Sequence, residues 1–357
     1  MNVVAPVASP VSPTPLKPSD FASDQEVRWC PGCGDYAILK AVQKALADLG
    51  ARPEKTVFVS GIGCSSRFPY YMATYGFHTI HGRAPAIATG VKMTNPELDV
   101  WVVTGDGDGL SIGGNHMLHV LRRNVDLQIL LFNNEIYGLT KGQYSPTSRV
   151  GTRSPSSPGG SIEDPVSPVQ FALGAGARFI ARAIDTQQKH LIAVLKAAQA
   201  HRGASFVEIY QNCIVYNDEV FAEFTGRNAA EQQQLLVEHG KPLVFAGGRK
   251  GLRLNHRDLS LEVVEIGEGG SGAAEVLVHD ETNRTLASLL AAMQPPEMPV
   301  ALGVLYANPQ PSFGERRGQA PRPVATAEAL NKVLRRGDTW VVSAPGEGTA
   351  PAPAGEA

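Results

Sequence analysis

Long apolar runs are missing from this chain of 357 residues, and no stretch approaches the length of about 20 residues that crosses a bilayer. The N-terminal residues also lack the basic segment followed by an apolar segment that marks a secretory signal peptide. Neither sign of charge is in excess, because 32 Lys and Arg face 34 Asp and Glu, a net charge of −2. We therefore expect a cytoplasmic protein that binds neither nucleic acid nor a membrane.

Cysteine is also scarce, since the chain has only four: Cys30, Cys33, Cys64 and Cys213. So small a set does not build the dense disulfide framework of small secreted domains. In a reducing compartment, the C-x-x-C spacing of the first two instead indicates a metal-binding or redox-active pair.

Both ends of the chain are poor in residues that build a core. Residues 1–22 are rich in proline and small polar residues, and residues 344–357 have a similar composition. We predict that both segments are disordered tails. Between them the hydrophobic pattern predicts a large region over residues 23–236 and a smaller C-terminal region over residues 237–343, because the signals weaken after residue 237.

The large region alternates between strand-like and helix-like patterns. Helical periodicity covers residues 36–50 and 115–123, and near-continuous apolar runs cover residues 56–63, 98–109 and 127–134. A helix at residues 188–200 and a strand at residues 205–213 continue the alternation. Strands of this kind are typical of a mostly parallel sheet with helices on both faces, so we predict an α/β fold with a small C-terminal α+β region.

A glycine- and aspartate-rich turn, GDGDG at residues 105–109, follows one apolar strand, and Asn133 and Asn134 end the next. A right-handed crossover places Asp106 and Asn134 at the carboxyl edge of the sheet, where α/β proteins bind ligands. The glycines allow backbone N–H groups to approach a phosphate. Carboxylates would repel a diphosphate unless a divalent cation lay between them. The oxygens of Asp106, Asn134 and the Ile136 backbone suit Mg²⁺.

Other phosphate-binding patterns fit this turn poorly. The dinucleotide motif G-x-G-x-x-G fails because Leu110 stands three positions after Gly107, and G-x-x-x-x-G-K-[ST] does not occur in the chain. The simplest alternative is an ordinary Gly/Asp turn followed by an Asn-Asn turn. We favour a ligand site because both turns lie at strand ends with crossover spacing.

These motifs, taken with their neighbours, resemble one protein family. Residues 29–36 (WCPGCGDY), 60–67 (SGIGCSSR), 81–90 (HGRAPAIATG) and 133–148 (NNEIYGLTKGQYSPTS) are similar in order to the β subunits of 2-oxoacid:ferredoxin oxidoreductases. The resemblance covers residues 24–220 and looks closest to the two-subunit bacterial enzymes acting on 2-oxoglutarate. It implies a fold that binds thiamine diphosphate and Mg²⁺, and oxidative decarboxylation of 2-oxoglutarate to succinyl-coenzyme A, or the reverse.

The resemblance also implies roles for single residues. Asp106, Asn134 and Ile136 would hold Mg²⁺, and Lys141 would lie near the carboxylate of the 2-oxoacid. The thiamine diphosphate would be lined by Ile62, Gly63, Cys64, Ser65, His81, Gly107, Asp108, Gly138 and Leu139. The four cysteines would ligate a [4Fe–4S] cluster. The implied partners are an α subunit, in a heterodimer or heterotetramer, together with ferredoxin, the 2-oxoacid and coenzyme A.

The residues alone leave the cysteine chemistry open. Cys64 lies in a glycine-rich loop after a strand and Cys213 follows another strand, so both can approach the Cys30–Cys33 pair at one edge of the sheet. Four cysteines also suit zinc, although its usual signature is two C-x-x-C pairs, and inert buried thiols are a further alternative. The resemblance favours the cluster, which would carry electrons away from the thiamine cofactor.

Three functions therefore compete at this stage: an iron–sulfur thiamine oxidoreductase, a non-oxidative thiamine decarboxylase or ligase with zinc, and a non-catalytic binding module held by a metal. A carboxylate is needed at the aminopyrimidine of thiamine diphosphate, and this sequence shows no convincing candidate. In the related enzymes that glutamate belongs to the α subunit, so we expect the chain to be inactive without its partner.

Overall fold

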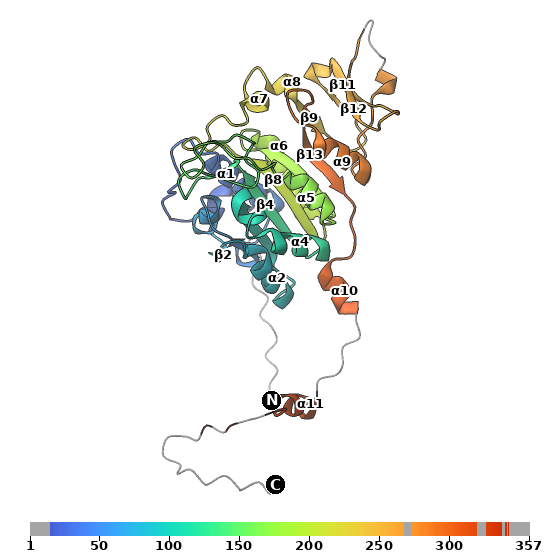
Figure 1. Cartoon of the computed structure of the whole chain (residues 1–357). Helices are drawn as coiled ribbons and strands as arrows, with labels where there is room; N and C mark the ends of the chain where they lie inside the picture. Colours follow the sequence, from blue (N-terminus) through green and yellow to red (C-terminus); the bar gives the residue numbers. More distant parts are fainter. Residues whose placement is uncertain (1–14, 268–272, 320–325, 338–339, 341, 343–357) are drawn as a thin grey trace. The chain divides into compact units, whose positions relative to one another are not determined.

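The computed structural model describes residues 15–267, 273–319, 326–337, 340 and 342. The chain divides into two compact units, one ending at Arg317 and one beginning at Gly318. The first unit is built on an eight-stranded sheet with the strand order β2-β1-β3-β4-β8-β7-β13-β9 (Figure 1). Neighbouring strands run parallel, apart from the antiparallel pair of β13 and β7. In the second unit the structure describes one helix, α11 Ala327–Leu334.

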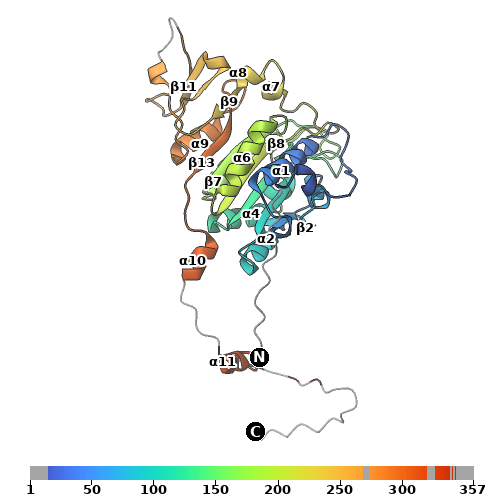
Figure 2. The same cartoon turned by 180° about the vertical axis from the view of Figure 1, so that it is seen from behind.

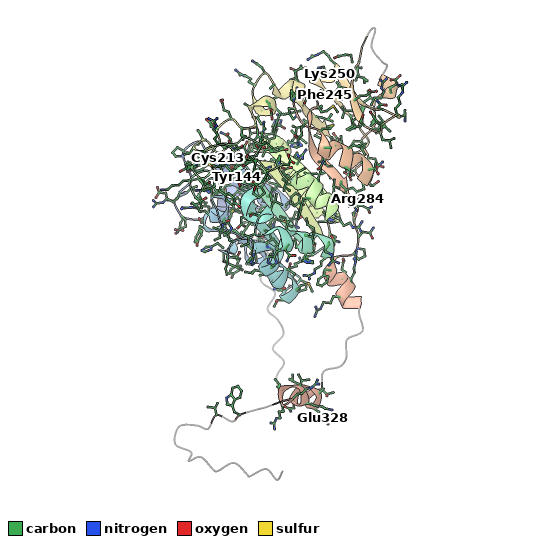
Figure 3. The ribbon with its side chains drawn as sticks, viewed as in Figure 1. Tyr144, Cys213, Phe245, Lys250, Arg284 and Glu328 are labelled. Atoms are coloured by element: carbon green, nitrogen blue, oxygen red, sulfur yellow. The ribbon has the colours of Figure 1, made fainter. Side chains whose placement is uncertain are left out.

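The strands of the main sheet are β1 Thr56–Ser60, β2 Tyr75–His78, β3 Asp99–Gly105, β4 Leu127–Asn133, β7 Phe179–Ile184, β8 Ala204–Tyr210, β9 Gln234–Val237 and β13 Val300–Ala307. Two smaller sheets contain β5 Ile136–Tyr137 with β6 Gln143–Tyr144, and β10 Val244–Phe245 with β11 Lys250–Leu254 and β12 Leu261–Glu265. Phe245 pairs with Lys250 where β10 meets β11 (Figure 3).

Helices cover both faces of the main sheet. One face carries α1 Asp35–Leu49 and α6 Gln188–Ala200 (Figure 2), and the other carries α2 Ala84–Thr94, α4 Gly114–Arg123, α5 Pro168–Gly174 and α9 Arg284–Ala292 (Figure 1). The shorter helices are α3 Asp106–Leu110, α7 Ala222–Thr225, α8 Ala230–Gln233, α10 Phe313–Gln319, η1 Pro18–Phe21, η2 Pro53–Lys55, η3 Ser65–Tyr71, η4 Ala246–Gly248 and η5 Ala273–Glu275. No helix among the described residues is long and apolar enough to cross a membrane.

The helix α1 shows how the sequence pattern produces this packing. Its apolar residues Ile38, Val42 and Leu46 recur every four positions and are all buried, as a helix that packs one face on a sheet requires. The helix ends at Gly50, whose φ of 64° is the left-handed conformation that favours glycine. Each large apolar side chain removed from water in this core contributes about 1.5–3 kcal/mol to folding.

The predicted α/β fold is confirmed, including the predicted strands at β1, β3, β4 and β8 and the helices at α1, α4 and α6. The tail predicted over residues 1–22 is wrong at its end, because Pro18–Phe21 forms a helical turn and Phe21 is buried in the core. Burial of this one aromatic side chain stabilises the turn, although the composition around it predicts disorder. Residues 1–14 and the predicted tail at residues 344–357 lie outside the described residues.

The structure does not divide at residue 237, where the sequence suggests a boundary. The strands β9 and β13 both belong to the main sheet, and β13 lies between β7 and β9. The small sheet of β10, β11 and β12 is the part that matches the expected C-terminal α+β region. An apolar run such as that of β13 predicts a buried strand, but it does not show which sheet the strand joins.

The parallel strands bring four chain segments together at one edge of the sheet. The strands β1, β3, β4 and β8 are neighbours, and their carboxyl ends are Ser60, Gly105, Asn133 and Tyr210. The residues that follow each strand therefore share one edge, as expected for a ligand site in an α/β sheet.

Candidate active site

The predicted Mg²⁺ ligands lie together at this edge. Asp106 directly follows β3 and Asn134 directly follows β4, and these two strands are paired up to Gly105 and Phe132. Asp106, Asn134 and Ile136 line the same narrow cavity. A carboxylate and an amide oxygen that share one cavity fit the ligand set of a hard divalent cation such as Mg²⁺.

The carboxylate of Asp106 is fully enclosed. Its Oδ2 accepts hydrogen bonds from Ser145 Oγ at 2.5 Å and from Thr147 Oγ1 at 2.6 Å. Burial raises the pKa of Asp106 to about 6, even though these hydrogen bonds act in the opposite direction. A buried carboxylate whose charge is met only by neutral donors is well placed to take a cation, because the cation would offset the charge.

The amide of Asn134 has a defined orientation. Its Nδ2 donates to Gln211 Oε1 at 2.7 Å, and its Oδ1 accepts a hydrogen bond from Ile136 N at 3.2 Å. The Gln211 contact occupies the nitrogen end, so the oxygen end is the one available as a metal ligand. Glu135, between the two cavity residues, has a φ of 54°, which turns the chain sharply after β4.

The second carboxylate of the turn, Asp108, holds a neighbouring loop close to the end of β3. Its Oδ1 accepts from Gly82 N at 2.8 Å and lies 2.6 Å from His81 Nδ1, and its Oδ2 accepts from Thr104 Oγ1 at 2.7 Å. His81 is thereby held at the wall of the cavity. Asp108 acts here as an anchor for the loop of residues 81–83, while Asp106 is the predicted Mg²⁺ ligand.

Gly61 gives a test of this anchor. A Cβ on Gly61 would lie 1.8 Å from Asp108 Oδ2, whereas a Cβ on Gly90, in α2, would meet nothing within 4 Å. Gly61→Ala should therefore lower the free energy of unfolding by about 1–3 kcal/mol, the usual cost of overpacking. Gly90→Ala is the control and should be neutral or stabilising by up to about 1 kcal/mol. Denaturant unfolding of both variants measures this, and a Gly61→Ala protein as stable as wild type would contradict the anchor.

All residues that the sequence predicts around thiamine diphosphate line this one cavity: Ile62, Gly63, Cys64, Ser65, His81, Gly107, Asp108, Gly138 and Leu139. The contact with the cofactor itself stays a prediction. Lys141 differs, because it is exposed, has a φ of 79° and is not among the cavity residues, although its neighbour Thr140 is. Its predicted contact with the substrate carboxylate also stays a prediction.

The four cysteines converge as predicted. Cys30, Cys33, Cys64 and Cys213 all line a second cavity, with a volume of about 180 Å³. A Cβ on Gly138 would lie 3.5 Å from the sulfurs of both Cys64 and Cys213, so both thiols lie beside this glycine. Burial, and next the carboxylate of Asp35, raise the pKa of Cys64 to about 12 and also raise that of Cys33.

The donor type at this cavity suits more than one metal centre. Four cysteine thiolates can hold a tetrahedral zinc ion, with each sulfur at about 2.3 Å from the metal. They can equally hold an iron–sulfur cluster. Which of the two binds here stays a prediction.

Asp35 lines both of these cavities, and the sequence analysis did not predict it. It is 1% exposed, and neither carboxylate oxygen has a hydrogen-bond partner. Burial, and next the nearby Asp185, raise the pKa of Asp35 to about 7. Gly34 and Asp35 directly follow the second cysteine, so Asp35 could be expected near the metal site. The sequence does not show, however, that its side chain points inward at the start of α1.

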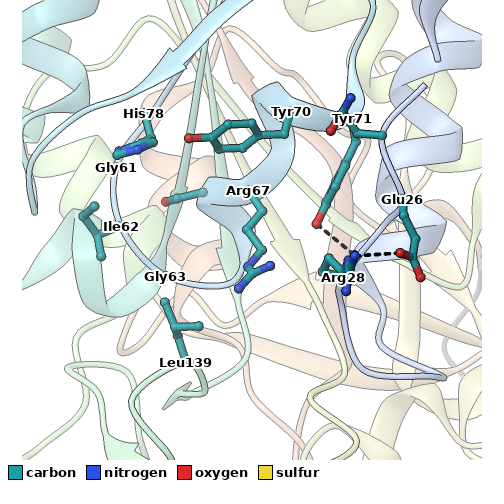
Figure 4. Close-up of a pocket in the computed structure, with 12 residues that line it drawn as sticks. Glu26, Arg28, Gly61, Ile62, Gly63, Arg67, Tyr70, Tyr71, His78 and Leu139 are labelled. Atoms are coloured by element: carbon teal, nitrogen blue, oxygen red, sulfur yellow. Dashed lines mark hydrogen bonds and ion pairs between the residues drawn. The ribbon is translucent and has the colours of Figure 1, made fainter. Parts of the chain in front are cut away.

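A third and larger cavity of about 510 Å³ lies beside the first. Ile62, Gly63 and Leu139 line both cavities, and the larger one adds Arg28 and Arg67. Arg67 points into the space next to Gly63 and Leu139, and Arg28 approaches from the other side, where Glu26 pairs with it (Figure 4). The remaining wall includes the aromatic side chains of Tyr70, Tyr71 and His78. Because Glu26 pairs with Arg28, the guanidinium of Arg67 is the group that makes this cavity suitable for an anionic small molecule.

Comparisons with known proteins agree with this geometry. Residues 61–209 match the family model of the thiamine pyrophosphate enzyme, C-terminal TPP binding domain. The chain is 48% identical over 344 residues to the 2-oxoglutarate oxidoreductase subunit KorB of Mycobacterium tuberculosis, covering 93% of this chain and 90% of that protein. It is 50% identical over 196 residues to the 2-oxoacid:ferredoxin oxidoreductase 1, subunit beta, of Aeropyrum pernix, of which it covers 62%.

A solved structure is also similar. It is a 2-oxoglutarate:ferredoxin oxidoreductase from Magnetococcus marinus with 2-oxoglutarate, coenzyme A and succinyl-CoA bound. The TM-score is 0.70 at 33% sequence identity, and the match covers 90% of this chain and 97% of that one. The similarity therefore extends beyond residues 61–209 and includes most of the strands and helices described above.

Proposed function

The chain belongs to the family of 2-oxoacid:ferredoxin oxidoreductase β subunits, and from this premise we propose its chemistry. It is the subunit that binds thiamine diphosphate and Mg²⁺ and carries a [4Fe–4S] cluster. With an α subunit it catalyses the coenzyme A-dependent oxidative decarboxylation of 2-oxoglutarate to succinyl-coenzyme A, or the reverse, and exchanges electrons with ferredoxin. Relatives named for 2-oxoglutarate support this substrate over other oxoacids.

One observation carries the proposal. We call the cavity around Asp106 and Asn134 the cofactor cavity, and the cavity around the four cysteines the cysteine cavity. They share five lining residues: Asp35, Cys64, Asn134, Gly138 and Leu139. Whatever occupies one cavity therefore lies next to whatever occupies the other. Thiamine diphosphate, when bound, supplies an electron sink for decarboxylation, and a cluster beside it would accept the electrons singly. A zinc ion at the four thiols could not accept them.

The chain's own residues supply binding and orientation. Asp106, Asn134 and the backbone of Ile136 would hold Mg²⁺ against the diphosphate, and Gly107 allows the backbone to come close. Tyr137 restricts this turn, because its hydroxyl donates to Gly107 O at 3.0 Å and its ring would clash with any Cβ there. The turn is therefore set before the cofactor binds, which reduces the ordering that binding requires.

The larger neighbouring cavity is our proposed entry for the dicarboxylate substrate. Arg67 offers positive charge for its carboxylates. Arg28, Arg67 and Leu139 also line the cysteine cavity, so the two cavities adjoin. Lys141, next to Thr140 of the cofactor cavity, is proposed to reach the carboxylate beside the reacting keto group. Its exposed position fits a residue that meets substrate when the partner subunit completes the site.

The α subunit is a further part of the proposal. Large apolar side chains are exposed around the edge strand β2 and the nearby loops, with Tyr75 at 65%, Ile80 at 74% and Ile112 at 56%. Exposed apolar groups of this size indicate a protein interface. None of the described residues that line the cofactor cavity is a glutamate, so the acid required at the aminopyrimidine would come from the partner. We place the complex in the cytoplasm, without contact to nucleic acid or membrane.

Activity of the assembled enzyme tests the proposed function. The chain co-purified anaerobically with its α subunit should reduce viologen with 2-oxoglutarate, and this should require coenzyme A and thiamine diphosphate. We expect kcat/KM for 2-oxoglutarate to exceed that for pyruvate or branched oxoacids by at least about tenfold, which corresponds to about 1.4 kcal/mol. The chain alone should be inactive.

Two outcomes would contradict this function. Turnover by the isolated chain would remove the need for a partner carboxylate. A colourless, zinc-loaded complex that decarboxylates without reducing viologen would indicate a non-oxidative thiamine enzyme instead.

A further inference from the structure

Gln211 lies between the two proposed cofactor positions. It is the first residue after β8, it is 1% exposed, and its backbone N donates to Asn133 O at 2.9 Å at the end of β4. A buried glutamine must satisfy both ends of its amide. The hydrogen-bond partners of this amide therefore show which neighbouring groups it holds in place.

One end of the Gln211 amide contacts a proposed Mg²⁺ ligand, and the other end contacts a proposed cluster ligand. Oε1 accepts from Asn134 Nδ2 at 2.7 Å, while Nε2 donates to Cys33 Sγ at 3.2 Å and to Asn212 O at 2.7 Å. The orientation is fixed by these partners, because turning the amide would bring Nε2 toward Asn134 Nδ2 and Oε1 toward Asn212 O. Among the described residues, this side chain alone has hydrogen bonds to both a proposed Mg²⁺ ligand and a cysteine.

We propose that Gln211 is a positioning residue that couples the Mg²⁺–diphosphate site to the iron–sulfur site. At one end it holds Asn134 so that the amide oxygen faces the metal. At the other end it donates a hydrogen bond to Cys33, which raises the reduction potential of the cluster. The inference rests on the proposed function, since it requires both groups to be present.

The two effects have separate physical causes. Residues that orient a metal ligand from behind it typically change metal affinity by about 10–100-fold when they are altered. A hydrogen bond to a cluster thiolate stabilises the reduced, more negative cluster more than the oxidised one, and so raises the potential. A single side chain that does both would keep the electron acceptor poised next to the site that delivers the electrons.

Two variants separate these effects in the complex with the α subunit. Gln211→Met has a similar length but neither donor nor acceptor, and Gln211→Glu keeps the acceptor for Asn134 but loses the donor to Cys33. The control is Gln128→Met, a buried glutamine on β4 with no hydrogen bond to a proposed ligand. Iron content, the cluster potential from redox-poised electron paramagnetic resonance, and the calorimetric Mg²⁺ affinity in the presence of thiamine diphosphate are measured for each.

Gln211→Met should weaken Mg²⁺ binding at least tenfold and lower the equilibrium constant for cluster reduction about tenfold, a shift of 59 mV for one electron. Gln211→Glu should bind Mg²⁺ within a few-fold of wild type but show a more negative potential. Gln128→Met should match wild type in both. If Gln211→Met fails to assemble, Gln211→Leu takes its place, because leucine also lacks a donor and an acceptor and, unlike glutamate, adds no charge beside the cluster.

Wild-type potentials in the Gln211 variants, with full iron content, would overturn the inference. Failure of the proposed function is a different result, because the wild-type complex itself would then lack the cluster.

Discussion

Asp106→Asn should abolish Mg²⁺-dependent binding of thiamine diphosphate while leaving the ligand-free protein folded. The substitution removes the only anionic oxygen among the three proposed ligands but keeps an acceptor for Ser145 and Thr147. Changes behind a metal ligand already cost about 10–100-fold, so we expect the loss of this direct ligand to cost at least about 100-fold in affinity. Isothermal titration calorimetry with thiamine diphosphate and Mg²⁺ measures the loss.

The raised pKa of Asp106 predicts how stability and cation affinity depend on pH. In the ligand-free protein burial raises it to about 6, so the stability that Asp106 contributes is greatest below its ordinary pKa and is lost as the pH rises through about 6. The Asp106→Asn variant should thus be as stable as wild type or more stable at pH 8. Cation binding requires the ionised form, so the affinity of the wild type should fall as the pH drops below about 6.

Asp99→Asn is the matched control, because Asp99 begins β3, the strand that Asp106 follows, and lies at its opposite end. It should bind the cofactor and Mg²⁺ like wild type. Unchanged binding by Asp106→Asn, or equal loss in both variants, would show that Asp106 is not the metal ligand.

Cys213→Ser should remove the cluster while sparing the thiamine site. Cys213 lines the cysteine cavity but not the cofactor cavity, unlike Cys64, which lines both. Loss of one of four thiolates should reduce the bound iron and the visible absorbance of the anaerobic complex to near zero, because no fifth cysteine exists to replace it. Viologen reduction should disappear, whereas calorimetric binding of thiamine diphosphate with Mg²⁺ should stay within a few-fold of wild type.

Val215→Ser is the control for this change, since Val215 is exposed and lines the same cavity. It should keep its iron and its activity. If Cys213→Ser kept full iron content and viologen reduction, the assignment of all four cysteines as cluster ligands would be contradicted, even though they line one cavity.

The residues that could be predicted from the sequence are those fixed by local pattern. Asp106 and Asn134 each follow a near-continuous apolar strand, and the rule for parallel crossovers then places them at one edge of the sheet. Cys30 and Cys33 are recognisable from their spacing. Cys213 is less certain from the pattern, because a single cysteine after a strand can only be expected near the same edge, and the structure then brings it into the same cavity.

The parts that could not be predicted depend on long-range packing. The burial of Phe21 and the place of β13 beside β7 depend on which surfaces remain uncovered after the rest of the sheet has formed. Asp35 and Arg67 lie within the quoted motifs and Gln211 lies two residues before Cys213, but their contacts come from side-chain directions that no spacing rule provides. Gln211 is the clearest example, since its partners Asn134 and Cys33 lie 77 and 178 positions away in the sequence.

Anomalous diffraction at the iron edge, from crystals of the αβ complex grown anaerobically with thiamine diphosphate and Mg²⁺, would locate both proposed cofactors in one measurement. We expect iron density for four metal atoms between the sulfurs of Cys30, Cys33, Cys64 and Cys213, and Mg²⁺ bound by Asp106 and Asn134 in the adjoining cavity. A single zinc peak at the sulfurs, or a diphosphate bound away from Asp106, would contradict it.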